Sequence, residues 1–216
     1  MTMQKMKPSQ PSSIKGLYAI TPDERNTAEL LRKTSLVLQG GARVLQYRNK
    51  LAAAELQLVQ ATALRNLTRE FGAILIVNDN ALLAQKVAAD GVHLGGEDGS
   101  IAAARAVLGS DKLIGVSCYN RLDLAHSAVQ NGADYVAFGA FFASTVKPNA
   151  PVASLALLQQ ARREIVLPIV AIGGITMANG ASLIAAGADS LAVISAVFAA
   201  ADIKQSAQQF SELAAA

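Results

Sequence analysis

The chain has 216 residues, of which 52% are hydrophobic and 5% aromatic, with no tryptophan, so we expect one domain with an aliphatic core. Its net charge is +3, and the lysines and arginines are scattered rather than clustered, which argues against a nucleic-acid-binding protein. No stretch of about 18 uncharged apolar residues is present, which excludes an ordinary membrane span. The single cysteine cannot form an internal disulfide, which favours a cytoplasmic protein.

The first fifteen residues, "MTMQKMKPSQPSSIK", differ in composition from the rest of the chain. They are polar, contain proline and lack the apolar segment of a signal peptide. We therefore expect residues 1–15 to form a flexible tail and residues 16–216 to form the single folded domain.

From residue 16 onward, short β-rich apolar runs alternate with longer amphipathic stretches. The runs cover residues 16–20, 43–48, 73–78, 91–95, 112–117, 135–140, 168–174 and 190–196. Helical patterns lie between them, for example over residues 26–40, 54–72 and 152–165. Near-continuous apolar strands separated by helices are typical of a parallel sheet whose outer face is covered.

A weak internal repeat supports this arrangement. The segments "GARVLQ", "ADGVHL", "GADYVAF" and "GADSLAV" each follow a helical pattern and open a strand, and three of them begin with glycine, as helix C-termini often do. Eight such units in about 200 residues predict a single α/β domain, a (β/α)8 TIM barrel. An open doubly wound sheet is the alternative, but the first strand–helix turn, "YAITPDERN", carries no dinucleotide-binding fingerprint.

In a (β/α)8 barrel, functional residues lie at the C-terminal ends of the strands. In this chain those ends are polar, mixed in charge and rich in groups that bind anions. They are Gln46, Arg48 and Lys50, then Asn78 and Asp79, then Asp98, Ser117, the segment 144–147, Gly173 and Gly174, and Ile194 and Ser195. The pattern predicts a site for a phosphorylated ligand.

Two aspartates, Asp79 and Asp98, follow neighbouring strands of this predicted barrel. If Arg48, Lys50 and Lys147 bind a diphosphate, the two carboxylates would repel it unless a cation lies between them. Mg²⁺ prefers oxygen ligands, commonly one or two carboxylates completed by phosphate oxygens and water, so we expect a magnesium site. Taken alone, Asp79 could instead cap a helix, and Asp98 could lie in an ordinary polar turn.

Backbone N–H groups near Gly174, Ile194 and Ser195 lie where such barrels commonly bind phosphate, although a tight structural turn is the alternative reading. We expect His93, which lies between two apolar residues, to be buried and hydrogen-bonded rather than catalytic. His126 is expected at the surface, and Cys118 has no expected chemical role.

The motifs "QYRNK", "ND", "VHLGGED", "GVS", "FFASTVK", "AIGGI" and "ISA" occur in an order that resembles the thiamine phosphate synthase family. The resemblance extends from Gly16 to about Phe210. It implies an enzyme of thiamine biosynthesis, which joins 4-amino-2-methyl-5-pyrimidinylmethyl diphosphate to thiazole phosphate and releases pyrophosphate.

The resemblance also implies a role for each matching residue. Residues Gln46, Tyr47, Arg48, Asn49, Lys50, Asn78, Ser117 and Lys147 would hold the pyrimidine diphosphate, and of these Arg48, Lys50, Ser117 and Lys147 would be catalytic. Asp79 and Asp98 would bind Mg²⁺. Ser144, Thr145, Val146, Gly174, Ile194 and Ser195 would hold the thiazole phosphate.

The residues fit a dissociative substitution, since no poised nucleophile or base triad is recognisable and none is needed when pyrophosphate simply departs. One departure from the family pattern is "ASTVK" in place of Pro-Thr-x-Thr-Lys, because Val146 lacks a hydroxyl.

The alternatives are a related barrel that aromatises thiazole phosphate, an aldolase or isomerase acting on a sugar phosphate, and a non-catalytic phosphate-ligand sensor. We expect small-molecule substrates as partners, and neither nucleic acid nor a membrane. The sequence is compatible with both a monomer and a homo-oligomer.

Overall fold

Eight parallel strands close into a barrel in the computed structural model, which describes residues 14–96, 99–142 and 152–215. Each strand pairs with the next along the chain, and β8 pairs with β1, so that the predicted (β/α)8 fold is confirmed. The strands are β1 (Gly16–Ile20), β2 (Val44–Tyr47), β3 (Ile74–Asn78), β4 (Gly91–Leu94), β5 (Leu113–Tyr119), β6 (Tyr135–Phe138), β7 (Ile169–Ile172) and β8 (Ser190–Val193).

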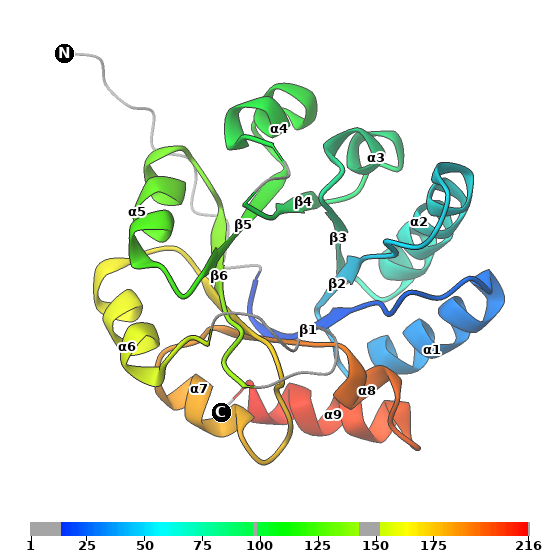
Figure 1. The fold of residues 1–216 in the computed structure, drawn as a ribbon. Coiled ribbons are helices and arrows are strands. Elements are labelled where there is room, and N and C mark those ends of the chain that lie inside the picture. The colour runs from blue at the N-terminus through cyan, green and yellow to red at the C-terminus, as the bar shows by residue number, and fades with distance from the viewer. Residues whose placement is uncertain (1–13, 97–98, 143–151, 216) are drawn as a thin grey trace.

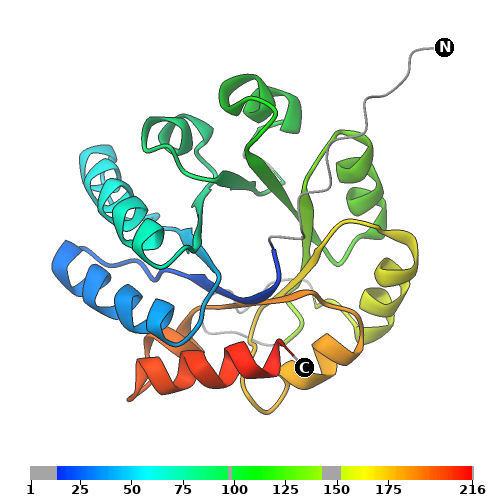
Figure 2. The same ribbon diagram turned by 180° about the vertical axis from the view of Figure 1, so that it is seen from behind.

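The helices surround the barrel and cover the outer face of its wall (Figures 1 and 2). They are α1 (Thr27–Gln39), α2 (Ala54–Glu70), α3 (Ala81–Lys86), α4 (Ile101–Leu108), α5 (Leu122–Gln130), α6 (Leu155–Glu164), α7 (Gly180–Ala185), α8 (Ser195–Phe198) and α9 (Ile203–Leu213). Among the described helices, none is long and apolar enough to cross a lipid bilayer.

The sequence of α1 shows why these segments become helices that pack on the wall. The side chain of Asn26 caps its N-terminus by accepting the backbone N–H of Glu29 at 3.1 Å. Its buried residues Leu30, Thr34 and Val37 recur at helical spacing and so share one face. The same kind of cap begins α4, α6 and α9.

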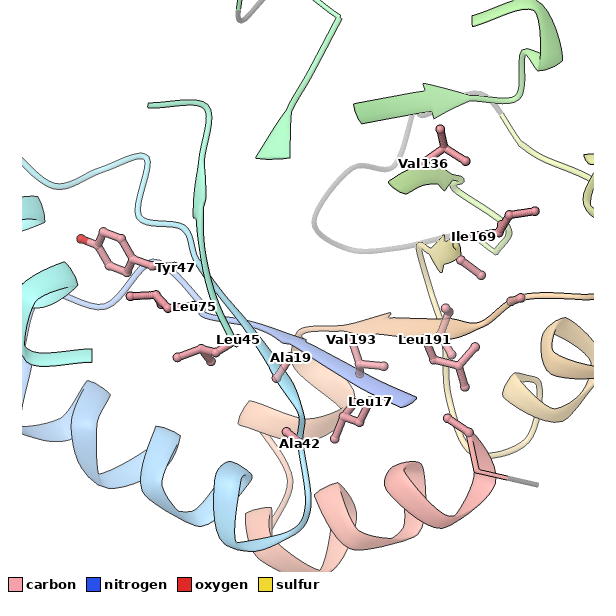
Figure 3. Close-up of a cluster of buried hydrophobic side chains, with 14 of the residues drawn as sticks. Leu17, Ala19, Ala42, Leu45, Tyr47, Leu75, Val136, Ile169, Leu191 and Val193 are labelled. Carbon is pink, nitrogen blue, oxygen red and sulfur yellow. The ribbon is translucent and has the colours of Figure 1, made fainter. Parts of the chain in front are cut away.

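The barrel wall separates two layers of core. Along β1, Leu17 and Ala19 belong to the larger cluster between wall and helices, whereas Tyr18 and Ile20 belong to the cluster inside the barrel. Figure 3 shows part of the outer cluster, including Tyr47. This alternation decides which side chains at each strand end can reach the interior.

At the N-terminal ends of the strands, three Arg–Asp pairs of the same kind stabilise the barrel. Before β4, β6 and β8 stands an aspartate that accepts a backbone N–H from the preceding strand and binds an arginine from an outer helix. The pairs are Arg65–Asp90, Arg105–Asp134 and Arg162–Asp189, with N···O distances of 2.6, 2.7 and 2.9 Å. The repeat recognised in the sequence therefore has a structural role, and it is broken before β2, where Arg43 stands in the aspartate position.

The turn before each repeat has the left-handed backbone that the glycines predict. The φ angles of Gly41, Gly132 and Gly187 are 96, 84 and 109°. Ala88 occupies the equivalent position with φ 52° and carries the strain that glycine avoids. Ile14, assigned to the tail by its sequence context, is 1% exposed and packs with the cluster inside the barrel; residues 1–13 lie outside the described part.

Candidate active site

Two adjoining hollows open at the C-terminal ends of the strands. The first, here called the central pocket, has a volume of about 300 Å³. It is lined by Tyr18, Ile20, Gln46, Arg48, Asn78, His93, Ser117, Tyr119, Ala137, Gly139, Ala140, Val170, Ile172, Gly173, Ala192 and Ile194. The second, the rim pocket of about 480 Å³, lies beside the ends of β2, β3 and β4, is also lined by α3 and α4, and includes Lys50 and Asp79. Arg48 and Asn78 line both pockets, so the two hollows meet there.

The strand alternation explains how polar side chains reach the central pocket. Val44 of β2 and Ile76 of β3 pack inside the barrel, so Gln46 and Asn78, two residues further along, continue on the interior face. Ser117 reaches the pocket from β5, and the structure therefore brings together these three residues with Arg48. Each was expected at the site from its position at a strand end.

Two cations of the site are held by carboxylates in this structure. The Arg48 guanidinium lies 3.2 Å from Asp23 Oδ2, and the Lys50 ammonium lies 3.1 Å from Asp79 Oδ2. Asp23 also accepts the backbone N–H of Lys50 at 2.7 Å, which fixes the loop that carries both cations. Asp23 was missed in the sequence; it lies three residues after β1 ends at Ile20, whereas Asp79 directly follows β3.

Asp79 adopts a left-handed backbone, with φ 60°, and its N–H donates to the His93 carbonyl at 2.8 Å. The cap of α3 is Asn80, whose side chain accepts the N–H of Leu83 at 2.9 Å. The helix-cap alternative for Asp79 is therefore wrong. Its carboxylate, 25% exposed, is left to interact with Lys50 and with the rim pocket.

Tyr47 and Asn49 point differently from Gln46 and Arg48, as the alternation requires. The Tyr47 hydroxyl donates to Gln60 Oε1 at 2.9 Å on the helix side of the wall, and its ring lies in the outer cluster (Figure 3). Asn49 Nδ2 donates to the same Gln60 oxygen and to the Glu24 carbonyl. Asn49 thus ties the β2–α2 loop to the β1–α1 loop, while Tyr47 binds α2; both residues also line the rim pocket, and direct contact with substrate stays a prediction for them.

Polar aromatic residues form the inner end of the central pocket. His93 is 8% exposed, and its two ring nitrogens lie 3.1 Å from Tyr135 Oη and 2.9 Å from Ser117 Oγ. The expectation of a buried, hydrogen-bonded histidine is confirmed, but the same ring also lines the pocket, which the sequence did not indicate. Tyr18 lines the pocket as well and was missed, because it lies inside an apolar strand run.

Tyr119 is a further pocket residue that was missed. It ends β5 in a left-handed conformation, with φ 53°, and its hydroxyl accepts the N–H of Gly96 at 3.0 Å. The bond joins the end of β5 to the β4–α4 loop. A strand predicted to end at residue 117 gave no signal for it.

The β7 and β8 ends form the remaining wall. Gly173 and Gly174 have φ angles of 101 and 62°, and a Cβ on Gly173 would lie 2.4 Å from that of Ala140. The Gly174 carbonyl accepts from Asn179 Nδ2 at 3.0 Å. Ile194 lines the central pocket, while Ser195 is exposed as the first residue of α8.

Some predicted residues lie outside the described part of the chain, namely Asp98, Ser144, Thr145, Val146 and Lys147. Within the described part, no group of three or more histidine, cysteine, aspartate and glutamate side chains could hold a metal ion.

Cys118 and His126, for which the sequence predicted no role at the site, also lie outside it in the structure. Burial raises the pKa of the Cys118 thiol to about 12, so the thiol is a poor nucleophile. His126 is exposed and contacts Glu164 at 2.8 Å, as expected for a surface residue.

A closed parallel barrel with cations, a carboxylate and hydrogen-bonding groups gathered at its strand ends is typical of enzymes that act on phosphorylated small molecules. A family model described as thiamine monophosphate synthase matches residues 17–197. A thiamine-phosphate synthase from Methylobacillus flagellatus is 58% identical over 200 residues, which cover 93% of this chain and 95% of that protein. Another, from an Azoarcus species, is 56% identical and covers 93% of this chain and 97% of that protein.

A solved structure, the thiamine phosphate pyrophosphorylase from Pyrococcus furiosus, is similar to this chain with a TM-score of 0.85. The two are 34% identical, and the match covers 94% of this chain and 96% of that chain. The chain belongs to the thiamine monophosphate synthase family.

Proposed function

We propose that the chain catalyses the coupling for which its family is named, with 4-amino-2-methyl-5-pyrimidinylmethyl diphosphate and thiazole phosphate as substrates. Pyrophosphate leaves the pyrimidinylmethyl carbon, and the thiazole nitrogen forms the new bond to that carbon. The observation that carries the proposal is the meeting of the central pocket with the cation-lined rim pocket at Arg48 and Asn78. A flat ring and an attached diphosphate need such a pair of adjoining sites.

The pyrimidine is assigned to the central pocket. Gln46 and Asn78 offer amide groups, each both donor and acceptor, that suit an aminopyrimidine edge. The aliphatic walls formed by Val170, Ile172 and Ala192 give the ring an apolar surface. The same walls exclude water, which would otherwise trap a carbocation before the thiazole nitrogen reaches it.

The diphosphate is assigned to the rim, where Arg48 offers a planar fork for phosphate oxygens and Lys50 a point charge. Both cations are paired with carboxylates in the free protein, at 3.2 and 3.1 Å, so a diphosphate would compete with Asp23 and Asp79 for them. As the C–O bond breaks, negative charge grows on the leaving pyrophosphate, and these cations stabilise it more strongly than they stabilise the ground state. Lys147 is proposed as a third cation of this set.

A magnesium ion is proposed at the same rim, held by Asp79 and Asp98. The donor set fits, because the Asp79 carboxylate faces the rim pocket and lies next to the Asn78 amide, and both offer the oxygen atoms that Mg²⁺ prefers. When bound, the ion would neutralise diphosphate charge and so remove the repulsion between substrate and carboxylates.

The thiazole phosphate is assigned to the far wall, near Gly174, Ile194 and Ser195, together with Ser144, Thr145 and Val146. Gly173 and Gly174 allow the backbone to come close to a ligand. The thiazole nitrogen is already a nucleophile, so no residue has to remove a proton from it. Catalysis then consists of holding the nitrogen in line with the bond that breaks.

The direct test is formation of thiamine phosphate from the two purified halves in the presence of Mg²⁺, with each half alone as control. Product should appear only when both are present. A chain that only aromatises thiazole phosphate would give no coupled product. A sensor would bind both halves without turnover, and either result would refute the proposal.

A further inference from the structure

Polar side chains from five strands form one continuous hydrogen-bonded chain across the inside of the barrel. Gln46 Nε2 donates to Tyr18 Oη at 2.8 Å, and Tyr18 Oη lies 2.9 Å from Tyr135 Oη. Tyr135 Oη lies 3.1 Å from His93 Nδ1, and His93 Nε2 lies 2.9 Å from Ser117 Oγ. Both ends of the chain, Gln46 and Ser117, line the central pocket.

The ring of Tyr135 is fixed at the middle of this chain. It stacks on the His93 ring at a centroid distance of 5.5 Å and meets the Tyr18 ring edge-on at 6.1 Å. On the β5 side it lies across Gly115, where an added Cβ would come within 1.9 Å of the ring. Because any side chain at position 115 would displace the ring, glycine there gives the Tyr135 hydroxyl one fixed place.

The protons along the chain can be assigned by counting. Tyr18 and Tyr135 are fully buried, which raises the pKa of both phenols, so each keeps one proton. The Tyr18 oxygen already accepts from Gln46, and its own proton is satisfied if Tyr18 donates to Tyr135. With the opposite polarity, that oxygen would accept two hydrogen bonds and the Tyr18 proton would have to point into the central pocket, so only the first polarity satisfies that proton within the chain.

The first polarity has a consequence at the pocket. If Tyr18 donates to Tyr135, then Tyr135 donates to His93 Nδ1, and the neutral imidazole carries its proton on Nε2. That proton is donated to Ser117 Oγ. The hydroxyl proton of Ser117 is then available to a ligand in the central pocket instead of being given to His93.

We propose that Tyr135 is a positioning residue, which acts through His93 to present the Ser117 hydroxyl to the ligand as a hydrogen-bond donor. The inference rests on the proposed function for the identity of that ligand. A serine that donates suits a hydrogen-bond acceptor of the ligand in the central pocket, whereas a serine that gives its proton to His93 can only accept from that ligand.

The first test is the tautomer of His93 in the ligand-free protein, read from nitrogen-15 NMR shifts. The sequence contains two histidines, so a His126→Gln variant assigns both signals. We expect His93 to carry its proton on Nε2. In Tyr135→Phe we expect a mixture of both tautomers, whereas Tyr18→Phe should keep the Nε2–H form because Tyr135 can still donate. A wild-type protein protonated on Nδ1, or a Tyr135→Phe variant with an unchanged tautomer, would overturn the proposal.

The second test is a double-mutant cycle on the coupling rate. We expect Tyr135→Phe to lower kcat about tenfold, the effect of losing one well-placed hydrogen bond to the ligand. Ser117→Ala should cost much less in that variant than in the wild-type protein, since both changes remove the same donated bond. Additive losses would overturn the proposal.

Ser190→Ala is the matched control, because it also deletes a buried hydroxyl, bonded to the Gly16 carbonyl at 2.7 Å at the start of β8. Ser190→Ala should leave kcat and the tautomer of His93 unchanged. A loss of kcat equal to that of Tyr135→Phe would mean that Tyr135 contributes only to the stability of the fold, which would overturn the proposal. If the wild-type protein made no coupled product, the proposed function would fail, but the tautomer measured without ligand would still decide the polarity.

Discussion

Replacement of Asp79 by asparagine tests the proposed metal site with little disturbance of the backbone. Asp79 has a φ of 60°, a conformation that asparagine adopts with less strain than alanine. Asparagine also keeps the size of the side chain and removes only its charge. Asp79→Asn is therefore a cleaner change than Asp79→Ala, which would add backbone strain to the loss of the carboxylate.

The structure predicts a small effect on stability and a large effect on turnover. The Lys50–Asp79 pair has side chains that are 51% and 25% exposed, so its loss should cost about 0.2–1 kcal/mol of folding free energy. In the reaction, the missing charge should cost up to about 4 kcal/mol, the energy of a close charge pair at an effective dielectric near 20. We expect kcat/KM to fall about 100- to 1000-fold.

The assay measures pyrophosphate release at a series of Mg²⁺ concentrations after EDTA treatment, beside thermal unfolding of the same samples. Manganese titration followed by electron paramagnetic resonance gives the metal affinity separately from activity. Asp123→Asn is a matched control, since that exposed carboxylate pairs with Arg121 and lines neither pocket. Near-normal turnover of Asp79→Asn in EDTA-treated buffer would refute the reasoning, as would unchanged manganese affinity.

Three further predictions concern the fold and the site. Ala88→Gly should raise the free energy of unfolding by about 0.5–1 kcal/mol, because relief of left-handed strain exceeds the added chain entropy; a decrease measured in urea would contradict this. Asp189→Asn should lower it by about 0.5–1 kcal/mol through loss of the half-exposed Arg162 pair, while kcat at 25 °C stays unchanged. Lys147→Ala should lower turnover in the pyrophosphate assay, and unchanged kinetics would remove Lys147 from the diphosphate site.

The fold was predictable because its evidence is repeated along the chain. Eight apolar runs and four similar strand openings, three of them with glycine at a helix end, all indicate the same unit, and such a signal survives an error at any one element. The strand limits were less predictable. The run over residues 168–174 ends as a strand at Ile172, because two left-handed glycines follow it.

The site was only partly predictable from strand ends. Gln46, Arg48, Asn78 and Ser117 were found because each follows a recognisable apolar run and shares the interior face. Strand order alone does not give the side to which a residue points. It therefore could not show that Tyr47 lies on the helix side of the barrel wall, with its hydroxyl on Gln60.

The tyrosine–histidine chain was missed for a different reason. Tyr18, His93 and Tyr135 lie within apolar strand runs, where polar aromatic residues look like ordinary core. Their hydrogen bonds join residues that are far apart in the chain, such as Tyr18 and Tyr135, and no local pattern records such pairing. Asp23 was missed because the first strand–helix turn was searched for a dinucleotide motif rather than for a carboxylate.

The account depends on metal-assisted departure of pyrophosphate from the rim pocket. The most direct measurement is pyrophosphate release during a single turnover, after the two substrates are mixed with metal-free enzyme, with and without added Mg²⁺. The account predicts rapid release with Mg²⁺ and a rate lower by orders of magnitude without it. Equal rates under both conditions would contradict it.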